Sequence, residues 1–112
     1  MAEYFRRLET VAQWNSVEAT KTDLFAGTGL FAGLNCFEPG QHQRVHVHQG
    51  ADKFYFVVSG KARITVSDET REVAAGTVVW APAGVPHGVA EAIERTVLLV
   101  AIAPPPPARA RS

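Results

Sequence analysis

From about residue 23 onward, the chain alternates between short apolar runs and turn residues. Strands of this length, recurring about every ten residues with glycine or proline between them, are typical of a β-sandwich or β-barrel. The pattern therefore predicts an all-β domain, with Gly40, Gly60 and Gly76 among its turn formers. The predicted strands cover residues 23–27, 29–38, 44–49, 53–59, 61–67, 70–74, 77–81, 86–90 and 96–103.

The same pattern predicts which side chains fill the interior of this domain. We expect Cys36 to be a small buried hydrophobe and not a nucleophile, because no basic group is evident beside it on its strand. Phe54 and Trp80 are expected either to line the mouth of the barrel or to pack between subunits. The large apolar residues expected inside are Phe31, Phe37, Tyr55, Val57, Ile64, Val66, Val79 and Leu99.

The two ends of the chain do not share the strand pattern. The spacing of apolar residues before residue 20 is compatible with a short amphipathic helical turn or with an arm packed on a sheet. Residues 104–107 are four prolines, which cannot pair in a central strand, and a short basic segment follows them. We therefore predict an N-terminal arm over residues 1–22, one barrel over residues 23–103 and a loose Pro-rich, basic tail over residues 104–112.

Composition and charge narrow the possible partners. A chain of 112 residues is long enough for one domain with its own core. Its 11 basic and 11 acidic residues balance, and the basic ones are scattered, so we expect neither a nucleic-acid nor a membrane partner. The single cysteine excludes an internal disulfide, and no signal segment or apolar run of about 18 residues is present. We expect a cytoplasmic protein.

Three histidines are the clearest candidates for metal ligands. His46 and His48 are two positions apart, so on a strand both side chains lie on one face, about 7 Å from each other along the chain. His87 follows a turn that begins at Pro82, and it can reach the same ion from a neighbouring strand. His42 would lie about 13 Å from His46 on an extended strand, so we expect it at the surface or rim.

Two stretches resemble the two motifs of the cupin superfamily. Residues 40–60 have the sequence GQHQRVHVHQGADKFYFVVSG, and residues 76–91 have the sequence GTVVWAPAGVPHGVAE. Fifteen residues separate Gly60 from Gly76, as in the compact single-domain cupins. The resemblance covers about residues 24–103 and implies a small antiparallel jelly-roll β-barrel. Carried over by position, it implies a metal held by His46, His48 and His87.

Two positions depart from the motifs. Lys53 stands where the family has a glutamate ligand, and Glu91 stands where it usually has an asparagine. Asp52 is a poor substitute for the missing carboxylate, because adjacent strand residues point to opposite faces. If Lys53 faces the interior, Asp52 should therefore face outward.

The charge of Lys53 limits what this residue can do beside a metal. A protonated amine about 4 Å from a divalent ion would be repelled by roughly 8 kcal/mol at an effective dielectric of 20. Keeping the amine neutral at pH 7 costs about 4.6 kcal/mol. Three arrangements remain: a neutral Lys53 that acts as a ligand or base, a charged Lys53 turned toward an anion, or a barrel without metal. Lys53 and Arg44 can also simply extend out of the barrel mouth.

Two classes of function follow from these residues. The first is a metal-dependent enzyme, oxygenase-like by first choice, that acts on a small carboxylate and uses Lys53 as its catalytic residue. Its cofactor would be a divalent iron, manganese, nickel, zinc or copper ion. The second is a non-catalytic small-ligand-binding cupin without a tightly bound metal. Cupins commonly pair, so the resemblance also implies a homodimer in which residues 1–22 can serve as an exchanged arm.

Overall fold

A computed structural model describes residues 3–107 of the chain. Each of the nine predicted strands is present: the last has its predicted bounds, 96–103, and the other eight differ at one or both ends. A single turn of helix precedes them among the described residues. None of the helices in this part of the chain is long and apolar enough to cross a membrane. The elements are α1 (Leu8–Val11), β1 (Thr20–Ala26), β2 (Phe31–Phe37), β3 (Gln43–His46), β4 (Asp52–Ser59), β5 (Lys61–Val66), β6 (Glu69–Ala74), β7 (Val78–Ala81), β8 (His87–Ala92) and β9 (Thr96–Ala103).

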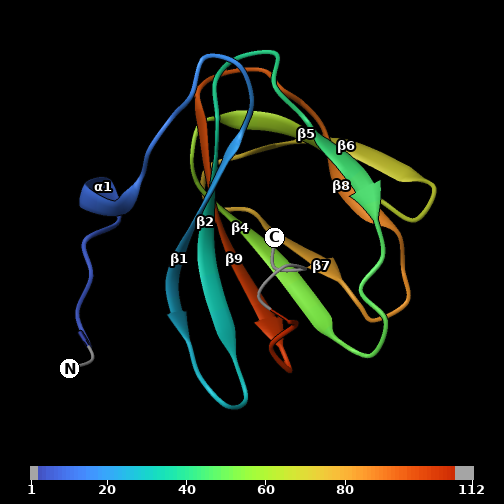
Figure 1. Cartoon of the computed structure of the whole chain (residues 1–112). Coiled ribbons are helices and arrows are strands. Elements are labelled where there is room, and N and C mark those ends of the chain that lie inside the picture. The colour runs from blue at the N-terminus through green and yellow to red at the C-terminus, as the bar shows by residue number, and fades with distance from the viewer. Residues whose placement is uncertain (1–2, 108–112) are drawn as a thin grey trace.

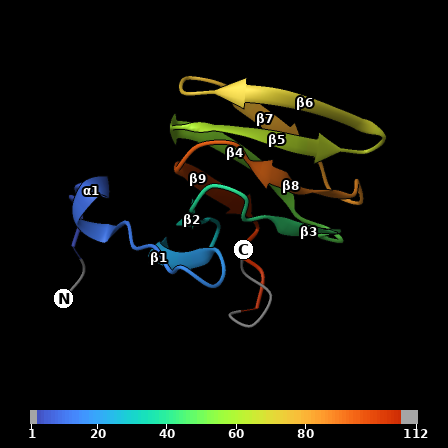
Figure 2. The ribbon, with the colours of Figure 1, turned by 90° about the horizontal axis from the view of Figure 1, so that it is seen from above.

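The strands form two antiparallel sheets that face each other (Figure 1). The five-stranded sheet has the order β1-β2-β9-β4-β7, and the four-stranded sheet has the order β3-β8-β5-β6. Seen from above in Figure 2, β1 and β3 lie on one side of the molecule, and β6 and β7 lie on the opposite side. This arrangement is the predicted jelly-roll barrel, and it brings β3, β4 and β8 together around one interior.

Strand alternation explains the interior of the barrel. Along β4, Lys53, Tyr55 and Val57 are buried, whereas Phe54 and Phe56 on the opposite face are partly exposed. The interior cluster is mainly aliphatic, as close packing between two sheets requires. Its buried members are Phe31, Phe37, Ala51, Tyr55, Val57, Ala62, Ile64, Val89, Ala92, Leu98, Val100 and Ile102. The predicted interior residues Val66 and Val79 are partly buried against this cluster.

A second apolar cluster lies on the outer face of the five-stranded sheet. Val11 of the helical turn packs there with Leu34, Cys36 and Val97. Leu99 also packs on this outer cluster, so its predicted place in the interior is wrong. Both faces of β9 are covered, so its residues are apolar on both faces. Without alternation of apolar and polar residues, the sequence did not indicate which face Leu99 occupies. Cys36 is fully buried, as predicted, and burial raises the pKa of its thiol.

The ends of the chain differ in part from the expected boundaries. β1 begins at Thr20, three residues before the predicted strand. The division into an arm, a barrel and a tail stays a prediction, and residues 108–112 of the predicted tail lie outside the described residues.

Candidate metal centre

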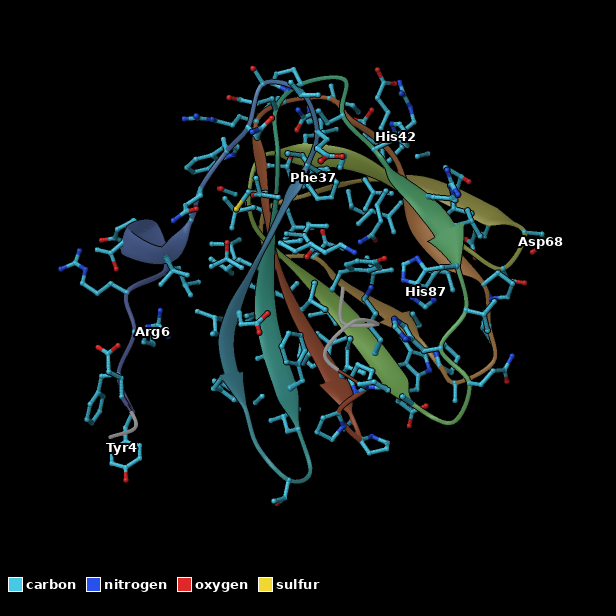
Figure 3. All side chains as sticks on the ribbon, viewed as in Figure 1. Tyr4, Arg6, Phe37, His42, Asp68 and His87 are labelled. Carbon is cyan, nitrogen blue, oxygen red and sulfur yellow. The ribbon has the colours of Figure 1, made fainter. Side chains whose placement is uncertain are left out.

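The fold brings the three predicted histidines together. His46 is the last residue of β3 and lies opposite His87, the first residue of β8. Within the described part of the chain, these two residues and His48 form a cluster whose ligand atoms all lie within 4.8 Å of one another. Figure 3 shows His87 in the space between the two sheets and His42 at the outer rim. His42 is exposed, as predicted.

The route by which His48 reaches the cluster differs from the predicted one. β3 ends at His46, so His48 does not share a strand with it. His48 lies in the turn that follows, where its carbonyl accepts a hydrogen bond of 3.0 Å from the Gly84 amide. The prediction that His46 and His48 lie on the same strand is therefore wrong, although their side chains still converge.

Backbone hydrogen bonds fix the rings of two of these histidines. Nδ1 of His46 lies 2.9 Å from the Arg44 carbonyl, and Nδ1 of His87 lies 2.9 Å from the Val85 carbonyl. A carbonyl can only accept, so each Nδ1 carries the proton and each Nε2 keeps its lone pair. Nε2 of His87 is buried and has no hydrogen-bond partner among the described residues. Such a nitrogen can donate its lone pair to a metal ion.

The three imidazoles are neutral near pH 7. Burial is the main cause that lowers the pKa of His48 and of His87 to about 4, and the charge of Lys53 adds to it. Burial also lowers the pKa of His46. Neutral imidazole is the form that binds a metal, so the protonation state fits a metal centre.

The donor set also fits a transition metal. Nitrogen ligands bind such ions at about 2.1 Å, so two of them on one ion are at most about 4.2 Å apart. The ligand atoms lie within 4.8 Å of one another, so shifts of about 0.6 Å would bring all three onto one ion. Three imidazoles suit iron, nickel, copper or zinc. That His46, His48 and His87 bind a metal remains a prediction.

Lys53 lies inside the barrel and does not extend out of its mouth. It is 1% exposed. Its Nζ donates a hydrogen bond of 3.3 Å to the Tyr55 hydroxyl, which in turn donates one of 2.7 Å to Oε1 of Gln43. The alternative in which Lys53 extends to solvent is therefore wrong, whereas Arg44 is exposed.

Burial changes the acidity of both groups in this chain of hydrogen bonds. It lowers the pKa of Lys53 to about 7, with a smaller contribution from the charge of Lys21, and it raises the pKa of Tyr55. The charge of Lys21 also lowers the pKa of His46 and His48. Lys21 is therefore a second cation that acts on this site, together with Lys53.

The two remaining acidic positions lie outside the cluster. Asp52 is exposed, as predicted from alternation, and its Oδ1 accepts a hydrogen bond of 2.9 Å from the Ala83 amide. It thereby holds the loop that leads to His87. Glu91 is exposed and forms an ion pair with Arg63 on β5. Neither carboxylate belongs to the histidine cluster.

A hollow of about 720 Å³ lies elsewhere, between the edge strands β6 and β7. Valines such as Val73 and Val79 line it together with charged residues such as Asp68 and Glu72. None of the clustered histidines lines this hollow, so the chemistry of the site is not located there.

Sequence reasoning missed Lys21, Tyr55 and Gln43 as polar neighbours of the cluster. Tyr55 was assigned to the interior only as packing, although its place two residues after Lys53 puts both on one face. Lys21 and Gln43 lie on other strands, and nothing in the local pattern indicates that these strands meet the site.

The fold and the site define a class: small antiparallel jelly-roll barrels with three clustered histidines that could hold a metal ion. The chain belongs to the cupin family, because the model of the cupin domain matches residues 33–102. This match includes both motif stretches.

Two proteins share 36% sequence identity with this chain. SCO3923 of Streptomyces coelicolor is 36% identical over 101 residues, which are 90% of this chain and 95% of that protein. The crystal structure of TT1209 from Thermus thermophilus has a TM-score of 0.87 at 36% identity and covers 93% of this chain and 100% of that one. The structure of KdgF from Halomonas sp. has a TM-score of 0.80 at 23% identity, over 95% of this chain and 96% of that one, and shows the fold alone.

Proposed function

We propose that this cupin is a metal-dependent enzyme that acts on a small carboxylate. The observation that carries the proposal is the neutral histidine cluster, in which Nε2 of His87 is buried without a described partner. His46, His48 and His87 would be the protein ligands of one divalent iron, manganese, nickel, zinc or copper ion. When bound, such an ion supplies Lewis-acid chemistry or, if it is redox-active, chemistry with oxygen.

The charges around the cluster support an anionic substrate. Neutral ligands leave the full positive charge on the ion, and Lys21 adds to the positive potential. No carboxylate belongs to the cluster among the described residues. A carboxylate group would therefore be attracted to this end of the barrel, and Lys53 would act beside it as a base.

Turnover assays test the enzymatic function. Protein reconstituted with each candidate metal should consume oxygen or substrate when it is given a panel of small carboxylates. A chelator and the variant His46→Ala should each abolish the reaction, whereas His42→Ala should keep it, because His42 is exposed at the rim. Metal-loaded protein that binds carboxylates without any turnover would contradict the enzymatic function.

The second candidate is a non-catalytic small-ligand-binding cupin. One observation favours it: a buried lysine occupies the place of the carboxylate ligand. Equilibrium dialysis of metal-free protein against the same carboxylates distinguishes the two candidates. A binding module would retain its ligand without metal, whereas the enzyme should need the ion.

The outer face of the five-stranded sheet supports a homodimer. Val78 is 61% exposed and Trp80 is 56% exposed, and they lie opposite Phe56 and Phe54 on β4. The outer face of the other sheet instead carries ion pairs such as Arg63–Glu91. Because exposed apolar patches of this kind mark interfaces, we propose that a second copy covers this face. Residues 1–22 would serve as an exchanged arm, and the cytoplasm is the compartment we propose.

A further inference from the structure

The Lys53 amine has an unusual environment for a lysine. Its side chain is 1% exposed inside the barrel. Among the described residues, each ion pair of an Asp or Glu side chain is formed with a cation other than Lys53. The amine is thus buried without a counter-ion, and a buried ammonium is costly in that situation.

The hydrogen bonds around Lys53 hold the amine in one orientation. The Tyr55 hydroxyl donates its proton to Gln43, so its oxygen accepts from Lys53. Nζ also lies 4.4 Å from the centre of the Tyr55 ring. One N–H bond is therefore fixed on a neutral oxygen, and a neutral amine held this way keeps its lone pair for another atom.

The other two lysines of the chain differ from Lys53. Lys61 forms an ion pair of 3.9 Å with Glu72 and is partly exposed. Lys21 is exposed on β1. Burial lowers the pKa of Lys53 to about 7. This direction agrees with the neutral amine that the burial and the hydrogen bonds of Lys53 indicate. A metal at the histidine cluster would add positive charge and would favour the neutral amine further.

We propose that Lys53 is a nucleophile that forms an imine with a small aldehyde or ketone that also carries a carboxylate, such as a 2-oxo acid. Desolvated lysines are activated for this chemistry. The carboxylate in this substrate class rests on the proposed function, whereas the reacting amine does not. Tyr55 is a positioning residue, because it holds the amine through the hydrogen bond.

The step balances without an oxidant or a reductant. The Nζ lone pair attacks the carbonyl carbon, a C–N bond forms, and the carbonyl oxygen becomes a hydroxyl that takes one proton from nitrogen. The hydroxyl then takes the second nitrogen proton and leaves as water, while the C=N bond forms. Water addition reverses both steps and returns the free amine.

The strands that carry Lys21 and His46 lie on one side of the molecule. β1 and β3 are the end strands of their sheets and lie on the same side of the molecule (Figure 2). Lys21 on β1 is exposed, and His46 at the end of β3 is only half-buried. The charge of Lys21 acts on Lys53 from β1 and would attract a small anion to this end of the barrel.

Reductive trapping tests the proposal directly. Metal-free and metal-loaded protein are incubated with pyruvate or glyoxylate and cyanoborohydride, and the modified lysine is found by peptide mass mapping. We expect Lys53 to be modified at least about tenfold faster than Lys61 at neutral pH, because its amine is the more often neutral. Modification of Lys21 and Lys61 with Lys53 unmodified would overturn the proposal.

Three variants complete the trapping experiment. Lys53→Arg should remove the rapid adduct, Lys61→Arg should keep it, and Tyr55→Phe should slow it while the metal content stays unchanged. The mapping on unaltered protein decides the outcome even if a variant fails to fold. Metal content and carboxylate binding are measured on the same samples. Protein that binds metal but leaves Lys53 unmodified overturns only the imine, and protein trapped at Lys53 that never binds metal overturns only the metal-dependent function.

Discussion

Burial of Lys53 lowers the stability of the folded protein whenever its amine is protonated. Its folded-state pKa is about 7, against an ordinary value of 10.5. Below pH 7 both the folded and the unfolded protein carry the proton, so the folded state bears the full cost of a buried charge. Above about pH 11 neither state carries it, and the cost disappears.

The unfolding free energy of metal-free protein should therefore rise between about pH 6 and about pH 11, the range that spans both pKa values. The rise that belongs to Lys53 is about 5 kcal/mol, since each pKa unit corresponds to about 1.4 kcal/mol. The variant Lys53→Met should lack this rise and should be more stable than the unaltered protein at pH 7. Urea unfolding at a series of pH values measures both effects.

The control for this prediction is Lys61→Met, because Lys61 is partly exposed and paired with Glu72. It should keep the rise. Parallel pH profiles for Lys53→Met and the unaltered protein would show that the buried amine does not titrate in this range.

Local pattern predicted the residues of the site but not their surroundings. Alternation along one strand correctly put Asp52 on the face opposite Lys53, but it left open whether Lys53 faces the interior or extends to solvent. Motif spacing selected the histidines that the fold gathers. The effect of Lys21 and the hydrogen bond from Tyr55 to Gln43 depend on which strands meet across the barrel, and no local pattern contains that information.

The turn between β4 and β5 has a strict requirement for glycine at position 60. Gly60 has φ +88°, and a Cβ there would lie 2.6 Å from Oγ1 of Thr96 and closer still to the Arg95 carbonyl. Gly60→Ala should therefore cost about 3 kcal/mol or more, from strain and from the collision together. Thermal and urea unfolding measure this loss.

Gly76 is the matched control because it has φ +93° and no atom within 4 Å of a Cβ. Gly76→Ala should cost only the strain of about 1–2 kcal/mol. Equal losses for the two variants would mean that close contact at Gly60 does not limit this turn.

Strand positions were predictable because turn residues separate the apolar runs. The end of β3 was not, because alternation through His46, Val47 and His48 continues after pairing with β8 stops at His46. Pairing is a property of two strands, and one strand does not reveal where it ends. The same limit explains Leu99, since a strand covered on both faces shows no alternation.

For the whole molecule, the exposed face of the five-stranded sheet makes the association state testable. Trp80→Arg places a charge on the exposed apolar patch formed by β4 and β7 and should convert a dimer into a monomer. Light scattering after size-exclusion chromatography measures the mass. The matched control is Arg71→Ala on β6, which belongs to the other sheet and should leave the mass unchanged.

A monomer for the unaltered protein at micromolar concentration would contradict the homodimer. A dimer that persists in Trp80→Arg would place the interface on another surface.

The central claim is that three neutral histidines of a cupin barrel hold one transition metal beside a buried lysine. Elemental analysis of purified, untagged protein, prepared without added metal, tests it most directly when His46→Ala/His87→Ala and His42→Ala are measured alongside. We predict about one transition metal per chain in the unaltered protein and in His42→Ala, and none in the double variant. No bound metal in the unaltered protein, even after reloading, would contradict the claim.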